Sequence, residues 1–201
     1  MSPDADPRAA RTRRKLGEAL LEECAQRPLG EITVAAVVRR AGVGRATFYL
    51  HYADVPALAV DTCAGIARDA VEALHAWRGV PDPARPPAPL TDFLEGVARH
   101  ADLHRTLLAP GGTGPLGEAL HRELRERSRA ERALAGGHSP ELIASAVSGT
   151  FRAVLADWLH GAVEGTPQDL AGEVWRLLIT LHRHPAPGAG GPGATGTGTA
   201  G

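Results

Sequence analysis

The sequence is poor in aromatic residues and in cysteines, and both shortages limit what the protein can be. It contains three Phe, three Trp and two Tyr among 201 residues, so leucine, valine and alanine must build most of the core. The two cysteines, Cys24 and Cys63, form no metal-type cluster, and we interpret them as free, buried thiols. This excludes a cysteine-based metal site, and we expect a cytoplasmic protein.

Long apolar runs are also missing, and the net charge is close to zero. No run approaches the roughly 18 residues of a membrane-spanning helix, so we expect no membrane partner. The N-terminal segment has no hydrophobic stretch after its charges, which excludes a secretory signal. The net charge is −1, but residues 1–52 hold nine basic and six acidic residues, a balance of +3, and residues 53–201 hold thirteen and seventeen, a balance of −4. The basic part is therefore the part suited to phosphate contact.

The segment 33–52 predicts two short helices joined by a glycine turn. Thr33 is an N-cap candidate, and the apolar residues after it recur at helical spacing: Val34, Val37, Val38 and Ala41. Gly42-Val43-Gly44 then interrupts the helix, and residues 45–52 resume it. Two helices joined in this way form a helix-turn-helix, which places its second helix in the major groove of DNA.

The second helix has one anchoring side and one side that suits DNA. Phe48 and Tyr52 share the anchoring side, and the residues pointing away are Arg45, Ala46, Thr47, Tyr49 and Leu50. Arginine bonds guanine bidentately, small apolar groups meet thymine methyls, and a tyrosine hydroxyl bonds phosphate. The alternative is a helical hairpin that binds no DNA.

At these residues the chain resembles the TetR family of transcriptional regulators, over roughly residues 11–65. The resemblance rests on Thr33, Val37, Val38, Ala41-Gly42-Val43, Thr47, Tyr49, His51, Tyr52 and Leu58. The chain departs from the family pattern at three positions. Gly44 replaces the usual Ser cap, Tyr52 replaces Phe, and Val55 replaces a Lys that contacts phosphate in many relatives.

We predict a DNA contact set from this pattern and resemblance. Arg45 makes the main base contact, and Ala46, Thr47 and Leu50 complete the base-reading surface. Thr33, Tyr49 and His51 position the DNA backbone. Arg13 and Arg14 begin the first helix, where cations oppose the helix dipole, so contact with phosphate or a minor-groove edge explains them. The alternative is a solvated basic end.

The whole chain predicts an all-α fold of about nine helices. We expect a disordered arm over 1–10, a three-helix DNA-binding domain over 11–54, a helical regulatory and dimerisation domain over 55–184, and a disordered Gly/Pro/Thr tail over 185–201. The expected helices are 11–26, 34–41, 45–52, 54–77, 90–101, 103–108, 116–135, 140–163 and 167–182. A proline-rich connector spans 79–89.

The last two helices are apolar on more than one side. Two such helices from each of two subunits would make a four-helix interface, and the family resemblance implies a dimer at the same place. The predicted homodimer interface is Val147, Gly149, Val154, Leu170, Val174, Trp175 and Leu178.

The resemblance also implies a pocket for a small molecule in the C-terminal domain. The predicted lining is Trp77, Phe93, Leu103, Leu107, Phe151, Leu155 and Trp158, and the alternative is that these residues form ordinary core. Few charged residues interrupt the set, which favours a hydrophobic or aromatic effector.

No catalytic motif is visible, and we predict no enzyme, no cofactor and no metal. His100 and His104 stand one turn apart, but the sequence identifies no third metal ligand. The sequence therefore predicts a ligand-responsive repressor that binds a palindromic operator, in double-stranded DNA, as a homodimer. The alternatives are a ligand-independent DNA-binding dimer and a helix-turn-helix fused to a metal-binding or enzymatic domain. A redox pair of Cys24 and Cys63 is a further alternative, because the first and fourth helices pack together in the family.

Overall fold

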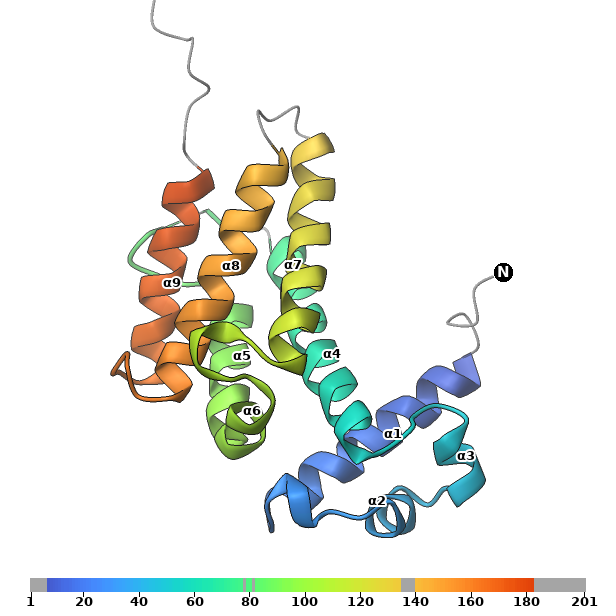
Figure 1. Cartoon of the computed structure of the whole chain (residues 1–201). Helices are drawn as coiled ribbons and strands as arrows, with labels where there is room; N and C mark the ends of the chain where they lie inside the picture. Colours follow the sequence, from blue (N-terminus) through green and yellow to red (C-terminus); the bar gives the residue numbers. More distant parts are fainter. Residues whose placement is uncertain (1–6, 78, 81, 135–139, 183–201) are drawn as a thin grey trace, which may run out of the picture.

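The computed structural model describes residues 7–77, 79–80, 82–134 and 140–182, and these form an all-helical fold (Figure 1). Within the described part there are nine α-helices, two short 3₁₀ segments and two isolated bridges, with no strand. This confirms the predicted fold class. The arm over residues 1–6 and the tail over 185–201 lie outside the described residues.

Three helices form the N-terminal domain: α1 Pro7–Cys24, α2 Val34–Ala41 and α3 Arg45–Tyr49. Helix α1 begins four residues before the predicted Arg11, so the expected disordered arm over 1–10 is too long. A proline in the first helical position explains this start, because its missing N–H needs no partner there. Helix α3 ends three residues before the predicted Tyr52. The N–H groups of His51 and Tyr52 both donate to the Phe48 carbonyl, at 2.9 Å, which closes the helix in a tight turn.

Local sequence signals set the bounds of α2. The Thr33 hydroxyl accepts a hydrogen bond from the Ala36 N–H at 3.2 Å, which satisfies one of the unpaired donors of the first turn. At the other end Gly42 adopts the left-handed conformation, with φ 65°, which disfavours any residue with a Cβ. This glycine turns the chain into the segment that leads to α3.

Helix α4, Val55–Ala76, connects the N-terminal domain to the rest (Figure 1). The Asp54 carboxylate accepts from the Ala57 N–H at 2.7 Å and caps the helix. Helix α4 contacts α1 at one end and α5 and α7 farther along. A single unbroken helix therefore spans both parts of the molecule.

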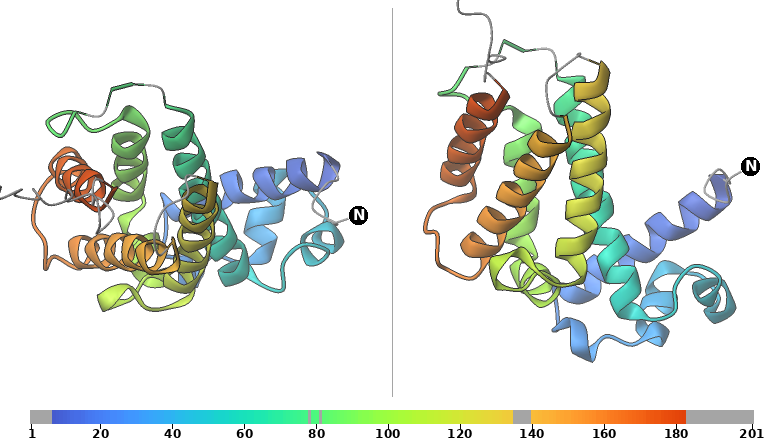
Figure 2. Two further views of the ribbon diagram at one scale, coloured as in Figure 1. Left: turned by 90° about the horizontal axis from the view of Figure 1, so that it is seen from above. Right: turned by 45° about the horizontal axis from the view of Figure 1, so that its top comes forward.

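The C-terminal part consists of α5 Ala88–Arg99, α6 Ala101–Leu107, α7 Pro115–Leu134, α8 Pro140–Leu159 and α9 Pro167–His182. Helix α7 packs on α8 and α5 packs on α9. Both views in Figure 2 place α9 on the side away from α1. Helix α8 ends four residues before the predicted Val163, since Gly161 adopts φ 80°. Thr166 and Asp169 then cap α9 reciprocally, each accepting the other's backbone N–H.

One described helix segment, Glu141–Leu159 of α8, is long and apolar enough to cross a membrane by length and composition. A core helix of a soluble protein passes the same test, so one such segment is weak evidence for a membrane span. Leu155, Ala156 and Leu159 on this helix are buried in the core, although only 33% of the segment is buried overall. Phe151, Val154 and Trp158 are half-buried against the core, whereas Leu142 is 68% exposed.

Candidate functional site

One buried aromatic side chain on the inner side of α3 anchors the helix and so fixes its exposed face. Phe48 is completely buried, and its ring lies 5.4 Å from the ring of Tyr49 and 5.9 Å from that of Tyr52. Helix α3 has five residues, far fewer than a helix needs to persist alone in water. Its conformation therefore depends on this anchor, as the sequence analysis predicts for Phe48 and Tyr52.

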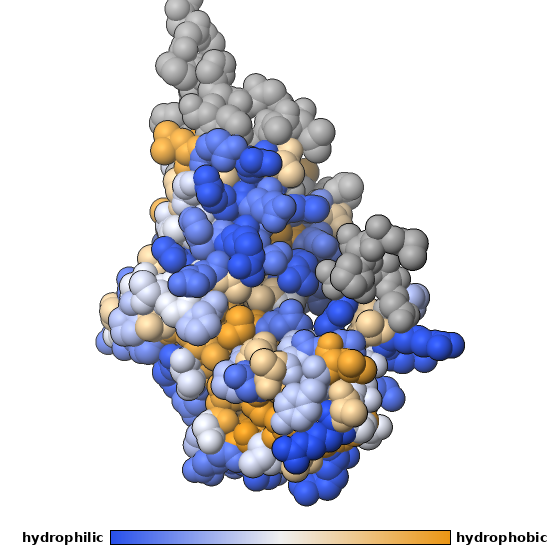
Figure 3. Space-filling view, turned by 45° about the vertical axis from the view of Figure 1, so that its right-hand side comes forward, coloured by the Kyte–Doolittle hydropathy of each residue, from blue (hydrophilic) through white to orange (hydrophobic). Residues whose placement is uncertain are grey.

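Large apolar groups remain outside on the same short helix and its C-cap. Tyr49 is 50% exposed and Leu50 is 82% exposed, while Arg45 and Ala46 are exposed and Thr47 and His51 are half-buried. The lower lobe in Figure 3 shows apolar surface among hydrophilic side chains, in contrast to the mostly hydrophilic lobe above it. An apolar side chain in this position can contact the methyl group of a thymine in the major groove.

Arg45 and Tyr49 hold each other across one helical turn. The guanidinium carbon lies 5.8 Å from the tyrosine ring centroid, and Nη2 donates to the hydroxyl at 3.4 Å. A cation over an aromatic face is attracted by the ring. The pair thus orders a side chain that would otherwise lose rotamer freedom on binding.

The other predicted backbone contacts are placed as follows. Thr33 is exposed at the start of α2, with its hydroxyl used as the cap. Arg13 and Arg14 line a cleft between α1 and α4 whose walls also carry Asp61 and Asp69, so their contact with DNA stays a prediction. Val55, where the family has a lysine, is buried and offers no group to phosphate.

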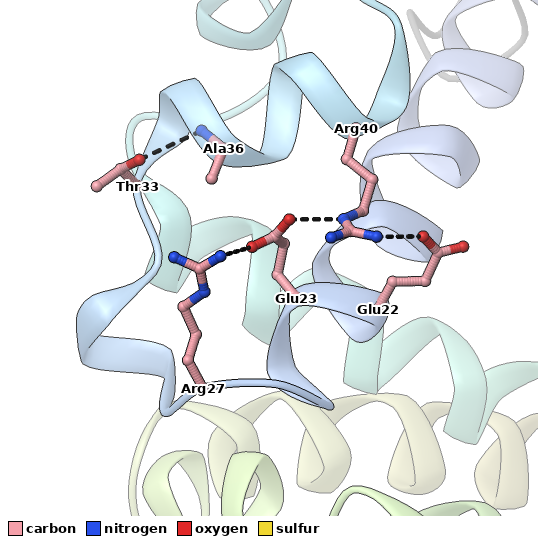
Figure 4. A network of polar contacts seen from close by, with 6 residues as sticks. All are labelled: Glu22, Glu23, Arg27, Thr33, Ala36 and Arg40. Atoms are coloured by element: carbon pink, nitrogen blue, oxygen red, sulfur yellow. Dashed lines mark hydrogen bonds and ion pairs between the residues drawn. The ribbon is translucent and has the colours of Figure 1, made fainter.

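A buried carboxylate joins α1 to α2 (Figure 4). Glu23 has no exposed surface, accepts from Arg40 Nε at 2.6 Å and pairs with Arg27 Nη2 at 2.8 Å. Arg40 also pairs with Glu22 at 3.1 Å. The hydrogen bond from Arg40 lowers the pKa of Glu23 below its ordinary value, against the opposing effect of burial. Sequence reasoning missed this network, although two adjacent acids near the end of α1 were its visible signal.

Glu23 should make stability depend on acidity. Its pKa is lower in the folded than in the unfolded state, so its contribution is present above the ordinary carboxyl pKa and is lost as the pH falls through the lower pKa of the folded state. We expect Glu23→Gln to lower the melting temperature at neutral pH and to approach the wild-type value in acid. Thermal unfolding of both proteins over a range of pH measures this difference. Asp169, whose pKa is also lowered, is present in both proteins and therefore cancels in the comparison. A difference that does not change with pH would contradict the prediction.

Tyr52 stands where the family pattern has a phenylalanine. It connects the turn that follows α3 to helix α4. Its ring is buried and its hydroxyl donates to Asp61 Oδ2 at 2.6 Å. Burial, followed by this hydrogen bond, raises the pKa of Tyr52. The hydroxyl therefore stays protonated and serves as a permanent donor to α4.

Tyr52→Phe keeps the ring and removes only this hydrogen bond. We expect it to lower the free energy of unfolding by about 1 kcal/mol, the usual net contribution of such a bond. Urea denaturation followed by circular dichroism measures the loss. Tyr49→Phe is the matched control, because the Tyr49 hydroxyl is at the surface; equal losses in both variants would refute a special role for the Tyr52 hydroxyl.

An apolar cavity of about 110 Å³ lies among α4, α5, α7, α8 and α9. Its apolar walls are Ala67, Ala70, Val71 and Leu74 of α4, Pro89, Leu90 and Phe93 at α5, Leu124 of α7, Val147 and Phe151 of α8, and Leu178 of α9. The rings of Phe93 and Phe151 lie 6.0 Å apart. The polar lining is His75, Arg127 and Ser128.

Only Phe93 and Phe151 of the predicted pocket residues line this cavity. Leu103, Leu107 and Leu155 are core residues that do not line it, and the two tryptophans are used elsewhere. Trp77 packs edge-on against Trp175 at 5.9 Å, and Trp158 Nε1 donates to the Gly165 carbonyl at 2.9 Å. The cavity residues that the sequence analysis missed follow the i, i+3, i+4 spacing along α4, a signal that does not distinguish cavity from core.

The predicted interface residues fall into two groups. Leu170, Val174 and Trp175 are buried within the single chain, and Trp175 Nε1 donates to the Asp82 carbonyl at 2.9 Å. Because these three side chains pack within their own chain, they have little surface left for contact with a partner. Val147, Gly149, Val154 and Leu178 are half-buried and remain candidates.

The histidine pair and the two cysteines do not form a metal site or a redox site in the described part of the chain. His104 is buried, and its Nδ1 is 2.9 Å from the His100 carbonyl oxygen. Burial lowers the pKa of both histidines. Among the described residues no three His, Cys, Asp or Glu side chains form a metal-binding group. Burial raises the pKa of Cys24 to about 11 and of Cys63 to about 12, which disfavours the reactive thiolates that a redox pair needs.

Comparison with known proteins agrees with this geometry. Residues 17–58 match the family model of bacterial regulatory proteins of the tetR family. A TetR transcriptional regulator from Rhodococcus sp. RHA1 is 20% identical over 86% of this chain and 96% of that one, with a TM-score of 0.56. The TetR family repressor AlkX from Dietzia sp. strain DQ12-45-1b is 16% identical over 90% and 98%, with a TM-score of 0.55. No curated protein matches the chain, and at these identities the solved structures establish a common fold.

Proposed function

Because the chain carries the DNA-binding domain of the TetR family of bacterial regulatory proteins and shares the fold of solved regulators of that family, we propose that it is a ligand-responsive repressor. It binds a near-palindromic operator as a homodimer in the cytoplasm, and we assign it no enzymatic activity. The observation that carries the proposal is the outer face of α3 and its C-cap. The side chains of Arg45, Tyr49 and Leu50 are exposed there, while Phe48 is fully buried.

The proposed reading of DNA follows from that face. Arg45 contacts a guanine, Thr47 and Leu50 contact neighbouring bases, and Tyr49 contributes by holding Arg45 in place. Thr33 and His51 are the proposed contacts to the DNA backbone. Hydrogen bonds to base edges supply sequence preference, whereas phosphate contacts supply most of the affinity without it. A two-fold pair of such helices would contact two half-sites spaced by about one DNA turn or a multiple of it.

The outer surfaces of α8 and α9 support the homodimer. A shallow, mostly apolar groove between them is lined by Val147, Thr150, Phe151 and Val154 of α8 and by Val174, Leu177 and Leu178 of α9. Leu142 and Leu177 are 68% and 45% exposed in the monomer. Exposed apolar patches mark protein interfaces, and each of these two helices contributes one such leucine. Pairing these two helices with their symmetry copies would form a four-helix interface.

The path of α4 supports regulation by a small molecule. Ala67, Val71 and Leu74 line the apolar cavity, and Asp61 on the same helix accepts the Tyr52 hydrogen bond. A molecule that binds the cavity more tightly in one position of α4 therefore also favours one position of the helix-turn-helix, α2 and α3. This is a shift between two populations, and it requires different affinities for the two states.

The first test is selection of bound duplexes from a random DNA library by the purified protein at two salt concentrations. An inverted repeat among the selected sequences would support a dimeric reader of DNA, and sedimentation of the complex would give the number of subunits. Binding that weakens with salt and enriches no motif would mean phosphate contact without base reading and would overturn the proposal. Release of the selected duplex by small apolar compounds then separates the ligand-responsive repressor from a ligand-independent dimer.

A further inference from the structure

The positions of α3 that point farthest from the core carry two apolar side chains. Phe48 and Tyr52 are buried on the inner side of the helix. At about 100° per residue, the position directly opposite this pair is Leu50, with Ala46 one turn before it. Both are exposed, and Leu50 keeps a helical conformation, with φ −70° and ψ −20°. Its N–H donates to the Ala46 carbonyl at 3.2 Å, so the two side chains share one face. We call this face the apolar crest.

The apolar crest is not explained by folding. Leu50 is 82% exposed, and substitution of so exposed a side chain changes stability little. Figures 1 and 2 both place α3 at the periphery of the described fold. The crest is therefore accessible to a partner.

The charge around the apolar crest favours DNA as that partner. Between Glu31 and Asp54 the sequence contains Arg39, Arg40 and Arg45 and no acid. Arg40 is paired with acids of α1, but Arg39 and Arg45 are exposed. Exposed cations without neighbouring acids attract phosphate, and an apolar protein partner would not require them.

The apolar crest can distinguish bases only by their apolar groups. The side chains of Ala46 and Leu50 have no hydrogen-bond donor or acceptor. In the major groove the C5 methyl of thymine is the apolar group of the base edges, and the other groups there are donors and acceptors. Arg45, beside the crest, provides the hydrogen bonds that suit guanine. The two kinds of contact therefore complement each other on one helix.

From these observations we propose that Leu50, supported by Ala46, contacts the C5 methyl group of a thymine in each operator half-site and that this methyl group determines the choice of base there. The proposal rests on the proposed function, since it names the group on the operator that α3 recognises. It follows that the protein distinguishes thymine from uracil, which presents the same hydrogen-bonding edge without the methyl group.

Replacement of thymine by deoxyuridine in the duplex obtained from the DNA selection tests the proposal with the full chain. Each thymine of one half-site is replaced in turn, and fluorescence anisotropy gives the affinity. We expect at least one replacement to weaken binding about fourfold, the fold-change that corresponds to burial of one methyl group. A selected half-site without thymine, or one in which no replacement weakens binding, would overturn the proposal.

Leu50→Ala identifies the side chain responsible. At the sensitive position this variant is expected to bind the thymine and deoxyuridine duplexes about equally. Val80→Ala is the matched control, because Val80 is 87% exposed and lies in the connector between α4 and α5; it should keep the preference for thymine. Circular dichroism checks that both variants fold, and a Leu50→Ala protein with the full preference for thymine would refute the assignment.

The failure of this inference is distinguishable from the failure of the proposed function. An inverted repeat in the DNA selection whose thymines all tolerate deoxyuridine removes only the methyl contact and keeps the regulator. The absence of any selected motif removes both. An inverted repeat with one sensitive thymine, whose sensitivity is lost in Leu50→Ala, supports both together.

Discussion

Phe48→Ala is expected to unfold the N-terminal domain under mild conditions and to abolish operator binding. The Phe48 side chain is completely buried, and truncation of such a ring removes about 3–5 kcal/mol from the free energy of unfolding. This approaches the whole stability of many small domains, about 5–15 kcal/mol. Helix α3 is also too short to remain helical once its anchor is lost, so DNA affinity should fall even where the rest of the domain survives.

Urea denaturation followed by circular dichroism, together with fluorescence anisotropy on the selected duplex, measures both effects. Phe48→Leu is the matched control, since it keeps much of the apolar volume and should cost roughly 1.5 kcal/mol or less. Phe48→Leu should retain operator binding. A Phe48→Ala protein with wild-type stability and affinity would show that α3 is held by other contacts.

Arg45→Ala is expected to weaken operator binding by about 1–3 kcal/mol and to relax the preference at one base pair in each half-site. The reason is the loss of a bidentate contact to guanine, the commonest specific contact of arginine in the major groove. Because the side chain is exposed, the folded protein should keep its melting temperature. The change would therefore separate recognition from folding.

Anisotropy titrations with the selected duplex and with single-base substitutions measure this effect. Arg122→Ala, on α7 in the other part of the molecule, should leave both affinity and preference unchanged. A uniform loss of affinity over all duplexes after Arg45→Ala would identify a phosphate contact. In that case the salt dependence of binding should also become weaker.

Local signals in the sequence were sufficient for the helix-turn-helix. Helix α2 spans residues 34–41 as predicted, because its limits are set by a side-chain cap at Thr33 and a left-handed glycine at Gly42. Asp54 similarly fixes the beginning of α4. Each of these effects acts within a few residues of the chain and can be recognised without knowledge of the fold.

The cavity depends on contacts between distant segments, and the prediction was poor there. Large aromatic residues were expected in the pocket, but an indole N–H needs a hydrogen-bond acceptor when it is buried. Of the two tryptophans predicted for the pocket, Trp158 donates to the Gly165 carbonyl and Trp77 packs edge-on against Trp175. The smaller residues of α4 line the cavity instead, and only the packed arrangement of five helices shows which of them border an empty space.

The division of α3 between one buried anchor and an exposed outer face has an evolutionary consequence. Substitutions at exposed positions usually change stability by less than about 0.5 kcal/mol, and Leu50, 82% exposed, contributes little to the core. Mutations there can accumulate without a folding penalty and shift the preferred operator in small steps. Duplicated copies of such a protein would be free to acquire new target sites while their scaffold stays under the same constraint.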